Sequence, residues 1–115
     1  MLSDNSKGVG NSGIRIVPQG DDAVVWVYGR LDIDSSPPLR DQLLALFTAK
    51  PRRELRIDLS AVTDIDSAGV ATLIEALKTA RAHDSELRLQ GLQDRVLSLF
   101  EVTGILSLFN GSTRA

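Results

Sequence analysis

The apolar residues of this chain change their spacing between residues 55 and 77, and this change limits the fold more than any other feature. Leu55, Ile57 and Leu59 alternate with polar residues, which is the period of a β-strand with one buried face. Further along, the spacing becomes that of one stripe of an α-helix, at Val70, Leu73, Ile74 and Leu77. The sequence therefore predicts a buried strand, a short acidic loop and a helix that begins at Ser67.

The junction between this strand and this helix carries the acidic or hydroxyl side chains Asp64, Asp66 and Ser67. The first N–H groups of a helix lack partners inside the helix, and the helix dipole makes this end partly positive. Ser67 or Asp66 would cap the helix there, and the same groups would stabilise a phosphate on Ser67. The small residues Ala68 and Gly69 leave room for a close approach. The pattern fits a plain helix cap and a modification site about equally well.

The rest of the chain predicts one α/β domain over residues 13–110, between a flexible tail at 1–12 and a polar tail at 111–115. In chain order, the other expected elements are strands at 14–16 and 23–28 joined in a hairpin, a helix with Pro37 and Pro38 in its first turn that ends before Pro51, the strand and helix described above, a strand at 87–89, a helix at 92–102 and a short strand at 105–109. Helices between successive later strands imply a mixed sheet with right-handed crossovers.

Composition narrows the possible classes of function. The 115 residues carry a net charge of −2 without a basic block, which argues against nucleic-acid binding. The chain has no cysteine, so a disulfide framework and a thiolate zinc site are excluded. No apolar run reaches the roughly 18–20 residues of a membrane span. No glycine-rich phosphate-binding motif occurs either. We expect a cytoplasmic protein without a cofactor or metal.

Residues 65–69 (IDSAG) resemble the nucleophile elbow G-x-S-x-G of hydrolases, with Ile65 in place of the first glycine. A nucleophilic Ser67 needs a base within about 3 Å. The single histidine, His83, lies near the far end of the same predicted helix, about 24 Å away. The sequence therefore argues against an enzyme. Five aspartates could supply oxygen ligands to magnesium, but no spaced loop of the calcium-binding type occurs, and most of them are expected to be solvated turn residues and caps: Asp32, Asp34, Asp58, Asp64 and Asp66.

Three stretches carry a resemblance to a known family. Residues 58–70 (DLSAVTDIDSAGV) resemble the signature of STAS domains, the family of bacterial anti-sigma factor antagonists. Residues 29–32 (GRLD) and 99–105 (LFEVTGI) resemble the family's turn after the second strand and its closing helix. The match covers about residues 13–110. It implies a small mixed sheet of four to five strands with three to four helices packed mainly on one side.

The resemblance also implies a non-catalytic regulatory function. In these antagonists the hydroxyl residue at the position of Ser67 is phosphorylated by a kinase-type anti-sigma factor and restored by a phosphatase. The unphosphorylated form captures the anti-sigma factor. Asp32 matches an acidic position near the nucleotide of the kinase. A phosphate adds about −1.5 to −2 charge, which next to Asp66 and Asp32 would make the surface strongly negative and weaken capture.

Two departures from the family pattern leave a second function within the family open, here called the second branch. Ala68 stands where many antagonists carry a second hydroxyl, and Arg30 replaces a common acid. Alanine also occurs in STAS subunits that dock on the ATPase of bacterial phospholipid-transport ABC systems. In either branch we expect the partner to contact the loop 62–67, the turn with Arg30 and Asp32, and the outer side of the helix 67–82. The predicted contact residues are Arg30, Asp32, Asp64, Asp66, Ser67, Ala68, Gly69, Thr72, Glu75 and Thr79.

Overall fold

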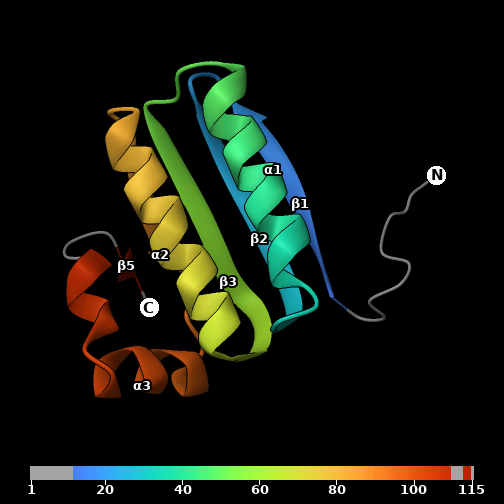
Figure 1. Ribbon diagram of the computed structural model, residues 1–115, viewed down its shortest axis with the longest axis vertical. Coiled ribbons are helices and arrows are strands. Elements are labelled where there is room, and N and C mark those ends of the chain that lie inside the picture. Colours follow the sequence, from blue (N-terminus) through green and yellow to red (C-terminus); the bar gives the residue numbers. More distant parts are fainter. Residues whose placement is uncertain (1–11, 110–112, 115) are drawn as a thin grey trace.

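Five strands form one sheet in the order in which they occur in the chain (Figure 1). The computed structural model describes residues 12–109 and 113–114. Its elements are β1 (Gly13–Gln19), β2 (Asp22–Leu31), α1 (Ser36–Ala49), β3 (Glu54–Ile65), α2 (Ser67–Ala82), β4 (Glu86–Gln90), α3 (Asp94–Val102), the 3-10 helix η1 (Ile105–Phe109) and β5 (Thr113–Arg114). Of the two predicted tails, residues 1–11, 111, 112 and 115 lie outside the described residues.

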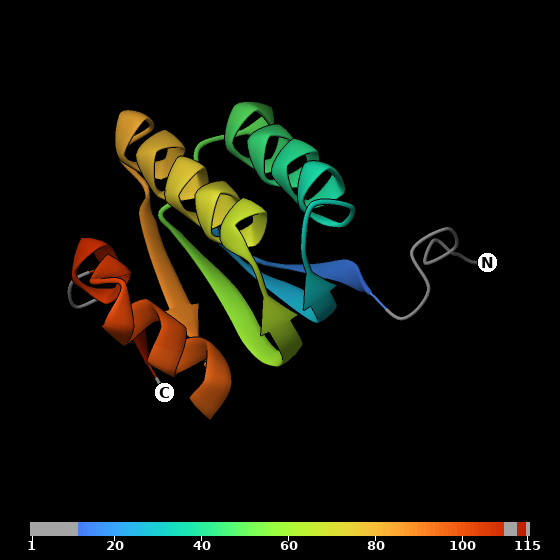
Figure 2. The same cartoon turned by 60° about the horizontal axis from the view of Figure 1, so that its bottom comes forward.

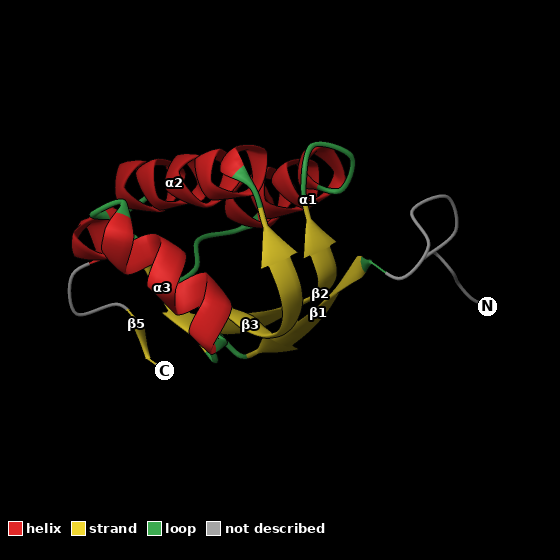
Figure 3. Cartoon of the chain, turned by 90° about the horizontal axis from the view of Figure 1, so that it is seen from below, coloured by secondary structure: helices red, strands yellow, loops and turns green. Residues whose placement is uncertain are grey.

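The sheet is mixed, as the sequence predicts. β1 pairs antiparallel with β2, whereas β2, β3, β4 and β5 follow one another in parallel. α1 and α2 lie side by side over one face of the sheet (Figure 3). α3 and η1 lie beyond α2, toward β4 (Figure 2). The predicted α/β fold with helices mainly on one side of the sheet is confirmed.

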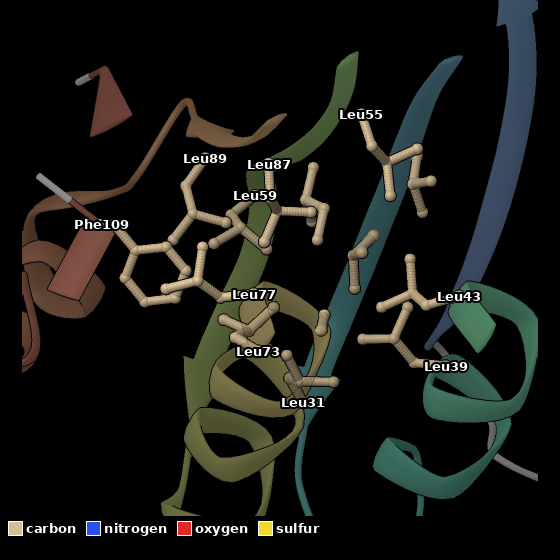
Figure 4. Packing of buried hydrophobic residues seen from close by; sticks show 14 of the residues in the cluster. Leu31, Leu39, Leu43, Leu55, Leu59, Leu73, Leu77, Leu87, Leu89 and Phe109 are labelled. Atoms are coloured by element: carbon tan, nitrogen blue, oxygen red, sulfur yellow. The ribbon is translucent and has the colours of Figure 1, made fainter. Parts of the chain in front are cut away.

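One apolar core lies between the sheet and the helices (Figure 4). Leu55, Ile57 and Leu59 of the central strand β3 are fully buried, as their alternation predicts. α2 and α1 cover them with the buried residues Leu73, Leu77, Leu39 and Leu43. At the β4 side the rings of Phe100 and Phe109 close the core, with 6.2 Å between their centroids. This packing fixes the position of α2, which carries the predicted site at its first turn.

The other face of the sheet carries charged side chains that pair with one another. Glu54 accepts hydrogen bonds from Arg56, at 3.2 Å, and from Arg88 on the neighbouring strand. Arg88 also contacts Glu86 at 3.1 Å. The β3–β4 part of this face is therefore polar and largely self-neutralised, whereas the β2 residues in register with it are Val24 and Trp26. Within residues 12–109 and 113–114, no helix has the length and apolar character that crossing a membrane requires.

Strands β2 and β3 extend further than predicted. The sequence predicts a polar connection from Gly29 and an acidic loop before Ser67, but β2 continues to Leu31 and β3 to Ile65. Two irregularities explain the difference, because the pairing of the two strands shifts register after Trp26 and again after Gly29. Each shift adds a residue on β3, breaks the alternation of apolar side chains and hides the second half of β3 from a period-two pattern.

The predicted strand at 105–109 is wrong. These residues form η1, a 3-10 helix, directly after Gly104, whose φ of +76° ends α3. Ile105, Leu106 and Phe109 turn toward the core at helical spacing, and Phe109 is completely buried. His83 lies at the C-terminal end of α2, as the sequence predicts. Its ring is exposed, and Nδ1 is 2.9 Å from the carbonyl oxygen of Thr79.

Candidate functional site

The parallel strands β2 and β3 end at the same edge of the sheet, and this edge brings the predicted site residues together. Arg30 pairs in register with Asp64, and Leu31 with Ile65. The N–H of Asp66 donates to the carbonyl oxygen of Leu31 at 3.2 Å, which ties the chain entering α2 to the end of β2. A shallow pocket at this edge is lined by Arg30, Leu31, Asp32, Asp64, Ile65 and Asp66.

Asp66 caps α2, and this decides between the two cap candidates. Its Oδ1 accepts hydrogen bonds from the N–H groups of Ala68, at 2.9 Å, and Gly69, at 3.1 Å. Ser67 is the first residue of the helix and is exposed. Its hydroxyl makes no hydrogen bond to any residue that the structure describes. The hydroxyl is therefore not needed for the cap and faces solvent at an accessible helix terminus.

The occupied cap changes the expected environment of a phosphate on Ser67. The sequence predicts that the free helix amides would stabilise the phosphate, but Asp66 already uses the N–H groups of Ala68 and Gly69. A phosphate would lie beside the carboxylate of Asp66 and close to the acidic pocket. Its charge would thus add to an existing negative surface instead of being neutralised by the helix.

Gly69 allows the first turn of α2 to lie directly against the end of β2. A Cβ atom at this position would come within 2.5 Å of the carbonyl oxygen of Leu31 and 2.8 Å of Cγ1 of Ile65. The space that the sequence reserves with small residues is therefore filled by the chain itself. Ala68, one residue earlier, is half-buried. Gly69 positions Ser67 and is itself buried, so it offers a partner no surface.

The turn between β2 and α1 is held by side-chain hydrogen bonds. Oδ1 of Asp32 accepts from the N–H groups of Asp34, at 3.0 Å, and Ser35, at 3.1 Å. The Ser35 hydroxyl donates to the carbonyl oxygen of Arg30 at 2.7 Å. The N–H of Ser35, and next that of Asp34, lower the pKa of Asp32 below its ordinary value. Asp32 is thus a charged, internally bonded residue of the turn.

Arg30 supplies the positive charge at this edge. Its Nε lies 3.9 Å from Oδ2 of Asp32, and its side chain is 71% exposed. The pocket that it lines also contains the carboxylates of Asp32, Asp64 and Asp66. In the part of the chain that the structure describes, no group of three acidic or histidine side chains is arranged to hold a metal ion. The edge is a mixed-charge surface with an acidic excess.

Two of the predicted contact residues on α2, Thr72 and Glu75, face α1 and not the outer side of the helix. Thr72 is only 7% exposed, because α1 covers this flank of α2. Glu75 forms an ion pair with Arg40 of α1, with Nε 2.9 Å from both carboxylate oxygens. Thr79 is half-buried and donates to the carbonyl oxygen of Glu75 at 3.0 Å. The helical step predicted which residues share a face with the sheet, but it could not reveal the neighbouring helix.

One exposed residue of this edge was not predicted from the sequence. Ile33 lies in the turn after Asp32, and its side chain is 71% exposed. A single apolar residue between two aspartates gives no periodic signal. Single exposed apolar residues are common on protein surfaces, so the sequence does not distinguish Ile33.

Comparisons with known proteins agree with this geometry. The family model described as "Mlab, STAS domain" matches residues 14–109. The anti-sigma-B factor antagonist of Listeria monocytogenes is 38% identical over 81 residues, which cover 70% of each chain. That of Bacillus subtilis is 29% identical over 105 residues, which cover 91% of this chain and 94% of the relative.

Solved structures show the same fold. The structure of a variant of RsbS from Moorella thermoacetica has a TM-score of 0.74 and is 26% identical, covering 89% of this chain and 85% of that one. A putative anti-sigma factor antagonist from Thermotoga maritima has a TM-score of 0.78 at 14% identity, covering 89% and 86%. The sequence match over nearly the whole described chain and the shared fold lead to one assignment: this chain belongs to the STAS domain family.

Proposed function

We propose that this protein is a non-catalytic anti-sigma factor antagonist that captures an anti-sigma factor through the edge formed by β2, β3 and the start of α2. The observation that carries this proposal is the position of Ser67. Its hydroxyl is exposed at the first turn of α2, is unused by the helix cap and lies in the stretch that resembles the family signature. Relatives at 29–38% identity are named anti-sigma-B factor antagonists, which supports the same function.

In this proposal a kinase-type anti-sigma factor phosphorylates Ser67, and a phosphatase removes the phosphate. The added charge of about −1.5 to −2 falls beside Asp66 and near Asp32 and Asp64. Because Asp66 already uses the N–H groups of Ala68 and Gly69, these amides do not compensate the new charge, and Arg30 is outnumbered by the carboxylates at this edge. A partner docked on this edge would face unpaired negative charge, so phosphorylation releases it. The protein acts in the cytoplasm, where its partners are found.

The direct experiment incubates the protein with ATP and each kinase-type anti-sigma factor of the source organism, and maps the phosphate by mass spectrometry. We expect label on Ser67 and none on the Ser67→Ala variant. Ser67→Asp should bind the anti-sigma factor at least tenfold more weakly, equivalent to about 1.4 kcal/mol, while Ser67→Ala binds it tightly in the presence of ATP. Normal labelling of Ser67→Ala would contradict the proposed switch.

A matched control separates local charge from total charge. Gln19 is exposed at the end of β1, where it pairs in register with Asp22 at the start of β2. This is the opposite end of β2 from the edge that carries Ser67. Gln19→Glu adds one negative charge far from the site and should leave capture unchanged. If Gln19→Glu and Ser67→Asp weaken capture equally, the effect comes from net charge and not from the site.

Ala68 keeps the second branch open, in which the domain docks on the ATPase of a phospholipid-transport ABC system. There the Ser67 hydroxyl would be a direct contact. Ser67→Ala and Ser67→Asp would then both weaken docking on the ATPase, and no kinase would label the protein. Because Ser67 does not cap α2, folded variants are expected in both cases, so the two branches give different binding results.

A further inference from the structure

Few large apolar side chains are exposed in the part of the chain that the structure describes, and one of them lies at the proposed site. The exposed set is Trp26, Ile33, Val102 and Leu108. Ile33 follows Asp32 in the turn that leaves β2, at the same end of the molecule as the start of α2 (Figure 1). Val102 ends α3, on a different element. Ile33 therefore offers apolar surface at the same end of the molecule as Ser67.

The turn that presents Ile33 is already ordered. Two hydrogen bonds join Asp32 and Ser35 across it. The N–H of Asp32 donates to the hydroxyl oxygen of Ser35 at 2.9 Å, and Oδ1 of Asp32 accepts from the N–H of Ser35 at 3.1 Å. The N–H of Ser36 donates to the carbonyl oxygen of Asp32 at 2.8 Å, so the turn leads directly into α1. Binding through a preordered turn costs little conformational entropy, which favours a strong contact.

Ile33 lies between charged residues. Asp32 precedes it and the exposed Asp34 follows it, while Arg30 and Asp66 line the pocket at the same edge of the sheet. An apolar side chain inside a polar rim is the usual arrangement of an energetically dominant contact, because the rim excludes water from the buried centre. The internal bonds of Asp32 leave its Oδ1 facing its own turn and away from a partner.

We propose that Ile33 is the apolar anchor by which this protein holds its anti-sigma factor, and that Asp32 is a positioning residue that keeps the turn in shape. The inference rests on the proposed function and adds the chemistry of the partner. The partner presents an apolar pocket for Ile33, with basic side chains at its rim that match the acidic excess of Asp34 and Asp66. The fold itself gains little from Ile33, because most of that side chain is exposed to solvent.

The first test measures the affinity of the full chain for the same purified anti-sigma factors, with Ile33→Ser and Val102→Ser as a matched pair. Val102 is 84% exposed, so both substitutions remove an exposed apolar side chain. We expect Ile33→Ser to weaken binding about 10- to 100-fold, the loss that follows from leaving one aliphatic side chain unburied. Val102→Ser should bind like the wild type, and both variants should keep the wild-type melting temperature.

The second test separates positioning from contact at Asp32. Asp32→Asn keeps an oxygen that can accept from the N–H groups of Asp34 and Ser35, whereas Asp32→Ala cannot. We expect Asn to bind within about threefold of the wild type and Ala to lose at least tenfold. Hydrogen exchange of the 33–36 amides should be faster in Asp32→Ala only. Equal losses in the two variants would show that the Asp32 charge touches the partner, which overturns its positioning role.

The outcomes distinguish the inference from the proposed function. If the wild type binds none of the anti-sigma factors, the proposed function is wrong, and so is the proposed role of Ile33. If the wild type binds and Ile33→Ser binds equally well, the function stands and the anchor is wrong. Equal weakening by Val102→Ser would also overturn the anchor. The anchor would also be wrong if sedimentation showed a dimer of the wild type that Ile33→Ser dissociates, while binding of the anti-sigma factor is unchanged. Ile33 would then join two copies of this chain.

Discussion

Two neighbouring residues at the start of α2 have separate tasks. Asp66 holds the helix terminus through the N–H groups of Ala68 and Gly69, and Ser67 offers a free hydroxyl. We expect Asp66→Ala to lower the free energy of unfolding by about 0.5–2 kcal/mol, the usual cost of losing an N-cap. Ser67→Ala should change it by less than about 0.5 kcal/mol, as at other exposed positions. Urea denaturation of both variants checks this, and the reverse order would make Ser67 the cap.

Asp58 is a buried carboxylate that joins β3 to β4. Its oxygens accept from the Ser60 N–H, at 2.9 Å, from the Ser60 hydroxyl and from the Gln90 amide, at 2.8 Å. Burial by itself would raise the pKa of Asp58, but the hydrogen bonds from the Ser60 hydroxyl, the Gln90 amide and the Ser60 N–H together hold it below its ordinary value. The folded state thus favours the ionised form.

The stability that comes from Asp58 is therefore pH-dependent. Because its folded-state pKa is lowered, its contribution is complete above the unfolded-state pKa of about 3.9 and disappears as the pH falls through the folded-state pKa. We expect Asp58→Asn to reduce the free energy of unfolding by about 1–3 kcal/mol at pH 7 and to flatten its decline below pH 4. Urea midpoints between pH 7 and pH 3 measure both effects. Parallel pH profiles for variant and wild type would contradict them.

Among single residues, the sequence could predict the position of Ser67 but not the division of tasks around it. The change of periodicity places a helix start at residues 66 and 67, whereas the choice of cap depends on φ and ψ of one residue. The role of Asp32 inside its own turn depends on the side chain of Ser35 and could not be read from spacing. The exposure of Ile33 could not be predicted, because a single exposed apolar side chain produces no periodic pattern in the sequence.

At the level of elements, the close approach of α2 to β2 depends on Gly69. Alanine in place of glycine usually stabilises a helix, by about 0.4–1 kcal/mol. At this position the new Cβ would collide with the backbone of Leu31. We therefore expect Gly69→Ala to destabilise the domain by about 1–3 kcal/mol, the cost of overpacking. Ala71→Ser, at an exposed position further along the same helix, is the control and should be nearly neutral in thermal unfolding.

The pairing of elements also explains what the sequence could not predict about α2. Its buried stripe was predicted correctly at Leu73 and Leu77, since a sheet-facing stripe has a simple period. The flank with Thr72 and Glu75 reads as polar, yet it faces α1 through the ion pair between Glu75 and Arg40. The hydrogen bond from Arg40 also lowers the pKa of Glu75. A polar seam between two helices looks like a solvated face until the position of the second helix is known.

For the whole molecule, we expect phosphorylation to act on the surface and not on the fold. Ser67 is outside the core, and the strands below it are fixed by buried residues such as Leu59. In amide exchange, phosphorylated and unphosphorylated protein should differ only near residues 30–36 and 64–70. The protection of β1, β3 around Ile57 and β4 should be the same in both forms. Loss of protection throughout the sheet would indicate a conformational switch.

The order of the strands has a kinetic consequence. Every strand after the first pairs with the strand that precedes it in the chain. The β1–β2 hairpin closes a short loop, whereas β2–β3 and β3–β4 are parallel pairings across crossover helices, which form more slowly. All residues of the edge proposed to capture the partner lie between β2 and the first turn of α2. This edge needs the hairpin and one crossover but neither β4 nor α3, so we expect the surface that recognises the partner to be complete before the last elements of the sheet are added.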